Sequence, residues 1–322
     1  MTDAAEVRQL KVAVTKKVQI ADDIFLFELQ ALSGSQLPPF TPGAHITVTT
    51  PSGQKRRYSL CNDSNERNRY VIAVKQEKEG RGGSLSFTTN VEGGATIDIE
   101  PPENEFEMSA TEPTRYIFIA GGIGITPIRA MILHCIRHGK TNFKLYYFTR
   151  SPNLMAFREE FAAPEFEGKV VMHHDSGDPE QAYDLWPILE EQNGAHMYCC
   201  GPRGLMDAVR DMTGHWSDSS VHFEDFVGAS ARHPDDKPFE VKLAKSGTVY
   251  EVAAGVSILD TLRKNGHVLP SSCESGTCGT CRTHFLEGEP DHRDLVLSEK
   301  EKKNEIMICV SRAKSSTLTL DI

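Results

Sequence analysis

Four cysteines near the end of the chain constrain its fold more than any other feature. Cys273, Cys278 and Cys281 follow the spacing C-x4-C-x2-C, and Cys309 lies further along the chain. This is the plant-type spacing for four thiolates that hold a [2Fe-2S] cluster. One glycine-bearing loop must wrap the cluster closely, because its backbone N–H groups approach the cluster sulfurs, while a remote strand supplies the fourth ligand. The spacing therefore predicts an iron–sulfur site.

The same four cysteines could instead bind zinc, form disulfides or be unrelated buried thiols. A structural zinc site usually takes two separate C-x2-C pairs or Cys/His pairs, whereas this chain has one C-x2-C. Disulfides are implausible in a chain of this length without a secretory signal. The cluster accounts for the complete spacing, so it is the favoured interpretation, with zinc and unrelated thiols left open.

The length and charge of the chain bound its class. With 322 residues, two or three domains are expected. The net charge of −10 argues against a nucleic-acid partner, which would call for a basic surface. There is no signal-peptide pattern and no apolar run of membrane-spanning length, and the other four cysteines read as reduced thiols. We expect a cytoplasmic monomer with no membrane partner.

The first third of the chain has the pattern of a small antiparallel β-barrel. Short strand-like segments alternate with turn residues such as Gly, Pro and Ser, which is typical of all-β barrels. The barrel is expected over residues 1–109, with strands at 10–20, 24–30, 45–50, 69–75 and 95–100.

Two short motifs in this barrel could handle a phosphate. The first is RRYSL at 56–60, and the second is GRGGS at 80–84, which opens a short helical segment. A glycine-rich loop before a helix presents backbone N–H groups and the positive end of the helix dipole, and an arginine can clamp the anion. Taken singly, a basic edge strand and an ordinary glycine turn explain them equally well.

The middle third alternates between strand and helix patterns, which predicts a parallel, doubly wound α/β domain. One helix is expected from Pro127, with Thr126 as its N-cap and Gly139 at its end. Trp186 and Trp216 are expected in the core. The domain is expected over 110–228, with strands at 115–120, 143–149, 169–175, 195–201 and 221–226.

Two loops of this domain lie where ligands bind in such sheets. GGIGITP at 121–127 follows the first strand, and CCGP at 199–202 ends the fourth. Ligands bind at the carboxyl ends of the strands, against helix N-termini. The first loop lacks the third glycine of G-x-G-x-x-G, so alone it is a weak signal, and glycines that serve only strand–helix packing are the alternative.

The last third begins with a polar, proline-bearing linker at 229–236. Residues 237–322 then read as a hairpin, a helix capped by Ser257, the cysteine loop, strands at 283–286 and 307–310, and a closing LTLDI. This arrangement, with the cysteine spacing, resembles the β-grasp fold of plant-type ferredoxins.

The motifs together resemble one family. RRYSLCND, GRGGS, AGGIGITP, YCCGP and SSCESGTCGTC occur in the order found in the phthalate dioxygenase reductase family, within the ferredoxin–NADP reductase superfamily. The resemblance covers essentially the whole chain. It implies FMN, NADH and a [2Fe-2S] cluster, with hydride passing to FMN and single electrons leaving through the cluster to a Rieske non-haem iron oxygenase, phthalate dioxygenase. Vanillate demethylase reductase and a non-enzymatic, cluster- or zinc-bearing nucleotide sensor are the alternatives.

The same resemblance assigns roles to individual residues. It places Arg56 and the GRGGS loop on the flavin phosphate, and Thr126 between flavin and nicotinamide. Thr126, Cys200 and Phe226 are the expected catalytic residues, acting on geometry and rate because hydride transfer needs no side-chain nucleophile or base. The expected cofactor-binding residues are Arg56, Arg57, Tyr58, Ser59, Ala73, Val74, Lys75, Arg81, Gly82, Gly83, Ser84, Gly121, Gly122, Gly124, Thr126, Thr149, Arg150, Cys200, Gly201, Pro202 and Phe226.

Two cofactor details rest on the resemblance. The second strand of the α/β domain ends in Thr149-Arg150, without the Asp or Glu that would hold an NAD ribose. Since arginine can accommodate a 2′-phosphate, the residues leave NADPH open, and the resemblance favours NADH. FMN over FAD is likewise carried by the resemblance.

Overall fold

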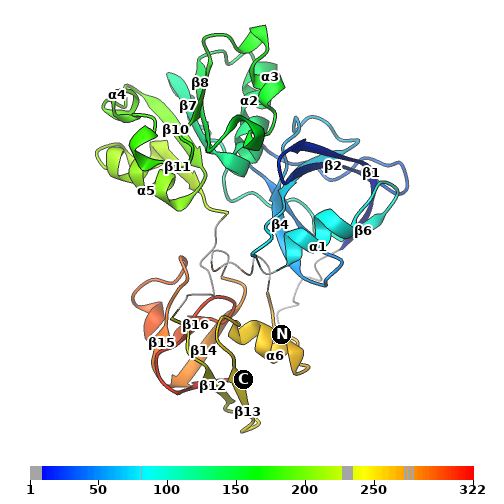
Figure 1. The fold of residues 1–322 in the computed structure, drawn as a ribbon, viewed down its shortest axis with the longest axis vertical. Coiled ribbons are helices and arrows are strands. Elements are labelled where there is room, and N and C mark those ends of the chain that lie inside the picture. Colours follow the sequence, from blue (N-terminus) through cyan, green and yellow to red (C-terminus); the bar gives the residue numbers. More distant parts are fainter. Residues whose placement is uncertain (1–8, 81, 227–234, 272–273, 275, 277–278) are drawn as a thin grey trace. The chain divides into compact units, whose positions relative to one another are not determined.

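The structure is a computed structural model that describes residues 9–80, 82–226, 235–271, 274, 276 and 279–322. The described residues form two compact units, one that ends at Phe226 and one that begins at Asp235 (Figure 1). The first unit contains a six-stranded and a five-stranded sheet, and the second contains a five-stranded sheet with a small two-stranded one. The residues of the predicted linker from 229 to 234 lie outside the described residues.

The first part of the first unit is an antiparallel barrel, as predicted. Its strands are β1 (Leu10–Ala21), β2 (Ile24–Ala31), β3 (His45–Thr49), β4 (Lys55–Ser59), β5 (Tyr70–Lys75) and β6 (Thr96–Ile99). They lie in the order β4-β3-β6-β1-β2-β5, and a bridge between Leu60 and Ile72 joins the two edges. Helix α1 (Gly83–Asn90) packs Phe87 into the barrel core.

The rest of this unit is a doubly wound parallel sheet, again as predicted. Its strands are β7 (Arg115–Gly121), β8 (Phe143–Thr149), β9 (Val170–His174), β10 (Ala195–Cys200) and β11 (Val221–Glu224), in the order β11-β10-β7-β8-β9. Side chains alternate, so Phe118 packs with α2 (Ile125–Arg137) and α3 (Arg158–Phe161), whereas Ile119 packs with α4 (Trp186–Leu189) and α5 (Arg203–Met212). Short 3-10 turns lie at Gly122–Gly124, Pro152–Leu154, Pro164–Phe166, Pro179–Gln181 and Asp218–Ser220.

Two local expectations for this domain were wrong. Helix α2 begins at Ile125, so Thr126 lies inside its first turn and its hydroxyl donates a hydrogen bond to the Ile123 carbonyl at 3.0 Å. The preceding 3-10 turn runs into α2 and replaces an N-cap. Trp186 is 46% exposed because α4 is a single turn that leaves this side chain outside, whereas Trp216 is buried, as expected.

The barrel and the α/β sheet share one apolar core. Ile24, Ala73 and Phe106 from the barrel belong to the same buried cluster as Ile125 and Ile128 of α2. A single unit therefore carries both halves of the predicted flavin–nicotinamide site.

The second unit has the β-grasp fold. Its strands are β12 (Phe239–Leu243), β13 (Val249–Val252), β14 (Arg282–Glu287), β16 (Glu305–Met307) and β18 (Thr317–Leu320), in the order β13-β12-β18-β14-β16. Helix α6 (Ile258–Lys264) is capped by Ser257, whose hydroxyl accepts a hydrogen bond from Asp260 N at 3.0 Å. Strands β15 (Pro290–Asp291) and β17 (Arg312–Ala313) pair separately, and a 3-10 turn covers Glu301–Lys303.

The strand expected at 307–310 lies earlier, at Glu305–Met307, and shares only Met307 with the prediction. Strand β16 ends at Met307, and Cys309 lies in a turn closed by the hydrogen bond from Val310 N to the Met307 carbonyl at 3.2 Å. In a turn, consecutive side chains no longer point to alternate faces of the sheet. Cys309 is therefore presented from a loop. The fourth cysteine is thus presented by the turn that follows β16.

Two largely buried arginines hold the start of the second unit. The carboxylate of Asp236, the last residue of the predicted linker, lies 2.7 Å from Arg293 and 3.6 Å from Arg312. Arg312 is 1% exposed and donates to the carbonyls of Lys237 and Ala253, each at 3.1 Å. A buried charge needs such partners, so this network fixes where the chain enters the β-grasp fold.

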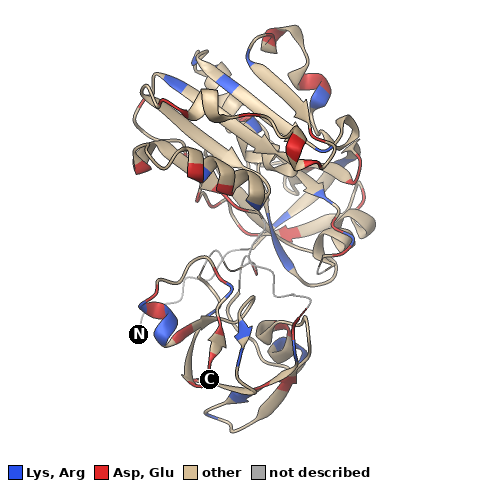
Figure 2. Ribbon diagram, turned by 60° about the vertical axis from the view of Figure 1, so that its left-hand side comes forward, with Lys and Arg blue, Asp and Glu red and all other residues tan. Residues whose placement is uncertain are grey.

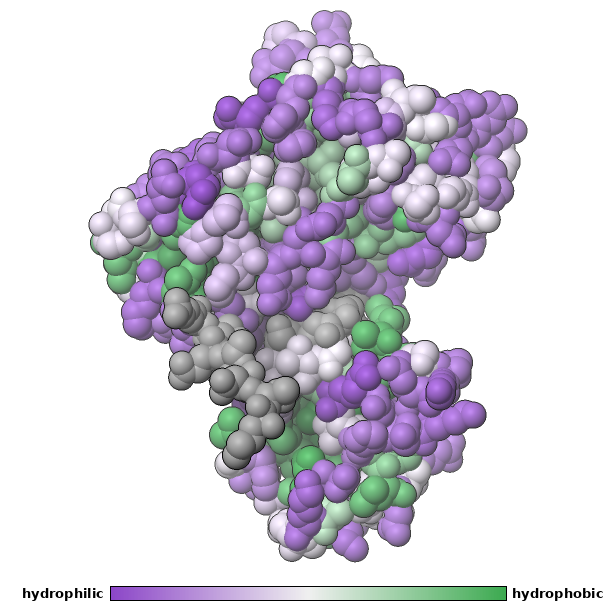
Figure 3. Space-filling model, turned by 180° about the vertical axis from the view of Figure 1, so that it is seen from behind, coloured by the Kyte–Doolittle hydropathy of each residue, from purple (hydrophilic) through white to green (hydrophobic). Residues whose placement is uncertain are grey.

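Charged side chains of both signs are interspersed over each unit (Figure 2). The face seen in Figure 3 is mainly hydrophilic, with apolar residues in small groups. Within the described ranges, no helix combines the length and apolarity needed to cross a bilayer.

Candidate cofactor-binding and electron-transfer site

Strand β4 sends its arginines in opposite directions, because neighbouring side chains of a strand point to opposite faces. The Arg56 guanidinium lies beside Gly83, at the start of α1. Arg57 forms an ion pair with Glu105, at 2.7 and 3.3 Å. Of the two arginines predicted to bind cofactor, Arg56 lies toward the glycine loop, and Arg57 pairs with a carboxylate.

The start of α1 has the features of a phosphate site. Gly82 has φ +85°, a conformation that favours glycine. A Cβ on Gly83 would lie 2.7 Å from Arg56 Nε and 2.8 Å from Gln54 Oε1, so a larger residue would displace the guanidinium. The first turn reads GSLS and carries no acidic side chain, which leaves the positive helix end unopposed. Arg81, also predicted here, lies outside the described residues.

Tyr58 supplies a hydrogen-bond donor next to this site. Its hydroxyl is buried and has no hydrogen-bond partner among the described residues. Its ring lies 5.7 Å from that of Phe87, and burial raises the pKa of Tyr58 well above its ordinary value. A neutral buried hydroxyl without a partner is costly, so the site suits a ligand that brings an acceptor. With Arg56 and the start of α1, it fits a phosphorylated flavin.

The other predicted flavin residues differ in what their side chains do. On β5, Val74 points into the barrel core, whereas Ala73 belongs to the cluster shared with α2. Ser84 accepts a hydrogen bond from Glu77 N at 3.0 Å, and Lys75 pairs with the Glu77 carboxylate at 2.6 Å. Val74 could reach a ligand only through its backbone.

In the α/β domain, glycines bring two loops into backbone contact. A Cβ on Gly124 would lie 2.2 Å from the Cys200 carbonyl oxygen and 2.9 Å from Gly201 N. A Cβ on Gly121 would lie 2.5 Å from Pro202 Cδ. Such distances are impossible for real side chains, so these positions require glycine. The structure thus joins the two motifs that the sequence places far apart.

Two of the three predicted catalytic residues, Thr126 and Cys200, lie at this junction. Thr126 is buried at the start of α2, and Gly122, with φ +55°, accepts a hydrogen bond from the Tyr147 hydroxyl at 3.1 Å. Cys200 is fully buried, and burial raises the pKa of its thiol well above the ordinary value, so it is a neutral thiol. Phe226, at the end of this unit, is 38% exposed, which leaves its ring available for stacking.

The residues predicted to hold the far end of the nucleotide are at the carboxyl end of β8. The Thr149 hydroxyl lies 2.8 Å from His174 Nδ1, at the end of β9. Arg150 is exposed and its aliphatic stem runs past Gly177, 3.6 Å from the position of a Cβ there. Both residues lie at the ligand-binding edge of the sheet.

Sequence reasoning missed Glu224, the last residue of β11. Its carboxylate lies 3.5 Å from the Ser59 hydroxyl of the barrel, and its charge also acts on the Cys200 thiol. Burial raises the pKa of Glu224 to about 8, and the neighbouring Glu105 adds to this effect. The sequence extended this strand to 226, so it did not place Glu224 at the strand end, where ligands bind in such sheets.

Replacement of this acid should change how stability depends on pH. The carboxyl of Glu224 has a pKa of about 8 in the folded protein against an ordinary 4.5, so its contribution is fully present below pH 4.5 and is lost as the pH rises through 8. We expect Glu224→Gln to become more stable relative to the natural protein between pH 5 and pH 9, measured by urea unfolding of the flavin-bearing unit. Glu92→Gln, at an exposed carboxylate, is the control, and a pH-independent difference would contradict the assignment.

In the second unit, two of the four predicted cluster ligands can be placed. Cys281 and Cys309 are both buried in the core of the β-grasp fold. Cys273 and Cys278 lie outside the described residues. No group of three or more His, Cys, Asp or Glu side chains that could hold a metal occurs within the described ranges, which omit these two ligands. Thiolates suit iron–sulfur clusters, so the donors present fit the predicted group.

The described parts of the cysteine loop have the backbone that such a site needs. Gly276 and Gly279 have φ +76° and +78°, which glycine adopts without strain. Glu274 is 2% exposed, and its carboxylate accepts a hydrogen bond from Arg263 of α6 at 2.9 Å. The same arginine donates to the Ser271 hydroxyl at 2.9 Å, so α6 fixes the loop beside the predicted ligands.

Three protein-family models match successive parts of the chain. The oxidoreductase FAD-binding domain matches residues 11–108, the oxidoreductase NAD-binding domain matches 118–211, and the 2Fe-2S iron–sulfur cluster binding domain matches 241–314.

Known proteins resemble the chain over its full length. It is 49% identical over 323 residues to phthalate dioxygenase reductase of Burkholderia cepacia, with 100% of both chains covered. It is 51% identical to the phthalate 4,5-dioxygenase oxygenase reductase subunit of Pseudomonas putida, with 96% of this chain and 95% of the relative covered. A solved structure of phthalate dioxygenase reductase superposes with a TM-score of 0.88 at 48% identity and covers 98% of each chain.

The fold and the sites define an NADH-dependent flavin iron–sulfur oxidoreductase. The cofactors predicted from the sequence, FMN, NADH and a [2Fe-2S] cluster, are confirmed with this class. Within it, the chain belongs to the phthalate dioxygenase reductase family. The zinc site and the non-enzymatic sensor are thereby set aside.

Proposed function

We propose that the chain is the reductase component of a phthalate dioxygenase system, which takes a hydride from NADH and delivers single electrons to a Rieske non-haem iron oxygenase. Its full-length likeness to two phthalate reductases at about half identity carries the choice of partner. The vanillate O-demethylase oxidoreductase of Pseudomonas sp. (strain HR199 / DSM 7063) is 37% identical over 97% of this chain and provides the alternative partner.

The arrangement of the first unit supports the hydride step. When bound, the nicotinamide supplies a hydride, the flavin accepts two electrons and releases them singly, and the cluster carries one at a time. In our proposal, Arg56 and the start of α1 bind the flavin phosphate, and Tyr58 donates to the flavin. Thr126 and Cys200 position the nicotinamide, and the Phe226 ring stacks until the nucleotide arrives.

The proposal includes the remaining expectations. The other predicted cofactor residues keep the roles assigned from the family. The domains extend over 1–109, 110–228 and 237–322, with the linker at 229–236. The protein acts as a cytoplasmic monomer. NADH is the donor although Arg150 is exposed at the nucleotide edge, because family membership favours it.

Reconstitution tests the proposal. Under anaerobic conditions, stoichiometric NADH should bleach the flavin and cluster bands of the purified protein within seconds. With added oxygenase, phthalate-dependent NADH oxidation should exceed vanillate-dependent oxidation with the demethylase oxygenase by at least about tenfold, which corresponds to roughly 1.4 kcal/mol. Preference for the demethylase oxygenase would move the chain to the vanillate system, and absence of bleaching would refute the reductase function.

A further inference from the structure

The side chain of Arg129 connects three segments of the first unit. It projects from α2, is 18% exposed, and donates from Nε to both carboxylate oxygens of Glu160 at 3.0 and 2.9 Å. Its Nη1 donates to the backbone carbonyl of Cys61. The guanidinium also lies over the Phe157 ring, 4.7 Å from its centre. A largely buried guanidinium with charge-assisted bonds on two sides holds its partners firmly.

The segments that meet at Arg129 belong to different parts of the predicted site. Cys61 follows Ser59 by two residues and begins the loop that leaves the flavin strand β4. Glu160 and Phe157 come from the connection between β8 and β9, where the single turn of α3 lies between two 3-10 turns. Phe157 has φ +57°, an unfavourable conformation for a bulky residue, so its position is imposed by its surroundings.

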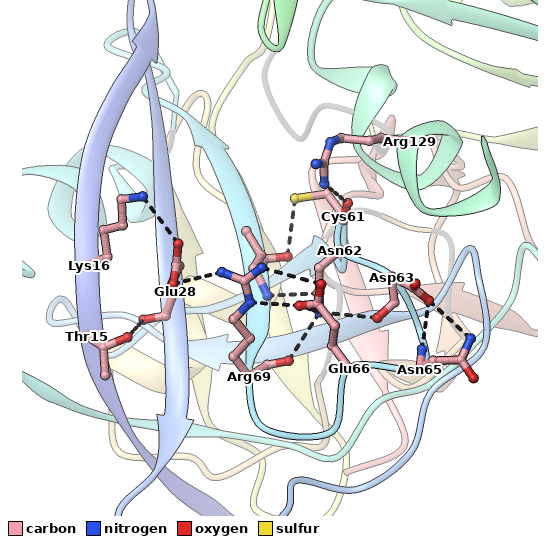
Figure 4. A network of polar contacts seen from close by, with 11 residues as sticks. Thr15, Lys16, Glu28, Cys61, Asn62, Asp63, Asn65, Glu66, Arg69 and Arg129 are labelled. Atoms are coloured by element: carbon pink, nitrogen blue, oxygen red, sulfur yellow. Dashed lines mark hydrogen bonds and ion pairs between the residues drawn. The ribbon is translucent and has the colours of Figure 1, made fainter. Parts of the chain in front are cut away.

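The loop that begins at Cys61 is rigid enough to transmit this contact to the barrel. Cys61 N donates to the Val71 carbonyl at 2.9 Å, and Val71 N donates to Asn62 Oδ1 at 3.0 Å. Arg69 then bridges Glu66 at 2.7 Å and Glu28 of β2 at 3.0 Å (Figure 4). The polar network therefore runs without a gap from Arg129 to the barrel strands.

The other end of the contact lies in the nicotinamide half. Arg129 follows Thr126 by three residues, so the two lie about one turn apart along α2. The glycine turn that meets the Cys200 loop immediately precedes this helix. A displacement of Arg129 relative to Cys61 would accordingly move the start of α2 relative to β4.

We propose that Arg129 is a positioning residue that sets the relative position of the flavin strand β4 and the nicotinamide-binding turn before α2. The inference rests on the proposed hydride transfer, whose rate depends steeply on the approach of the two rings, since a misplacement of about 1 Å can cost roughly 100-fold. Arg129 itself need touch neither cofactor.

The same helix provides a matched control. Arg137 lies two turns further along α2 and pairs with Asp63 of the same loop at 2.5 Å; its side chain is 53% exposed, whereas that of Asp63 is 11% exposed. Asp63 also accepts hydrogen bonds from Asn65 N at 2.9 Å and Asn65 Nδ2 at 3.1 Å, so it keeps partners when the exposed arginine is lost, and the pair with that arginine should contribute little. Arg137→Gln removes the same charge from the same interface and should leave the relative position of the flavin strand and the nicotinamide-binding turn unchanged.

Anaerobic stopped-flow mixing of the holoprotein with NADH tests the proposal. In Arg129→Gln we expect flavin reduction to slow at least about tenfold at saturating NADH, and the long-wavelength absorbance of a stacked nicotinamide–flavin pair to fall with it. Flavin content and melting temperature should stay close to those of Arg137→Gln, which should reduce its flavin within twofold of the natural rate. Arg129→Lys, which keeps the charge without the fork of donors, should fall between them.

The outcomes separate the inference from the function on which it rests. An unchanged rate and absorbance in Arg129→Gln would overturn the positioning role while the proposed function stands. A slow rate that merely follows lost flavin or a lowered melting temperature would also overturn it, because the role would then be structural support. A natural protein whose flavin NADH does not reduce would refute both.

Discussion

In Cys309→Ser, we expect NADH-driven reduction of cytochrome c to fall by at least about 100-fold while the reduction of a two-electron dye persists. Cys309 is buried in the turn after β16, in the second unit. Serine offers a weaker, harder ligand than thiolate, so the cluster should be lost or incompletely assembled. The flavin and nicotinamide residues belong to the first unit, which has its own cores and should still accept electrons from NADH. Iron content, the visible spectrum and the two activities measure the separation.

Cys135→Ser is the matched control for Cys309→Ser. Cys135 is a fully buried thiol on α2, and burial raises its pKa to about 12, so it is a packing residue in its protonated form. Its replacement should lower the melting temperature of the first unit and leave the iron content unchanged. If Cys309→Ser lost the dye activity as well, the two units would depend on each other and the separation of electron steps by domain would be wrong.

Much of the fold could be predicted because apolar patterning fixes the elements. The strands of the parallel sheet alternate sides so regularly that Phe118 and Ile119 pack into different cores, and both cores are apolar. Element ends were harder to predict. Thr126 has the residue type of an N-cap, but a 3-10 turn runs directly into α2. That turn provides hydrogen-bond partners at the start of the helix, where a capping side chain would otherwise do so. Cys309 leaves β16 for a turn that no local sequence pattern indicates.

The site was predictable where one motif carries the chemistry. The sequence indicated the glycines of the two nucleotide loops because a close approach of two backbones allows only glycine. It indicated Arg56 because binding of an anion favours arginine. Glu224 and Arg129 could not be found in this way, since their meaning lies in contacts with Ser59 and with the Cys61 carbonyl, far away in the sequence. Such pairings come from the packing of the barrel against α2 and the end of β11, which no local pattern records.

Gly124→Ala should have an effect as large as the loss of the cluster, but on the first electron step. Gly124 has φ −60°, which alanine adopts readily, so any defect must come from space. Its Cβ would lie 2.2 Å from the Cys200 carbonyl oxygen and 2.5 Å from the carbonyl carbon. These are backbone atoms that cannot rotate away, so the two nucleotide loops must separate. We expect NADH-driven flavin reduction to fall by about 100-fold, while dithionite still reduces flavin and cluster fully.

Gly204→Ala distinguishes this clash from a general effect of alanine near the nucleotide. Gly204 lies in α5, just after the Pro202 loop, and a Cβ there would meet no atom of the described residues within 4 Å. Alanine in a helix is favoured over glycine by up to about 1 kcal/mol, so this variant should be at least as stable as the natural protein and equally fast with NADH. If Gly124→Ala were also fast, the Cys200 loop would have to yield without cost, and its close packing would not be what aligns the nicotinamide. If flavin reduction is slow in Gly124→Ala and normal in Gly204→Ala, the backbone contact between the two loops is what aligns the nicotinamide. Glycine is then needed at position 124 for space and not for flexibility.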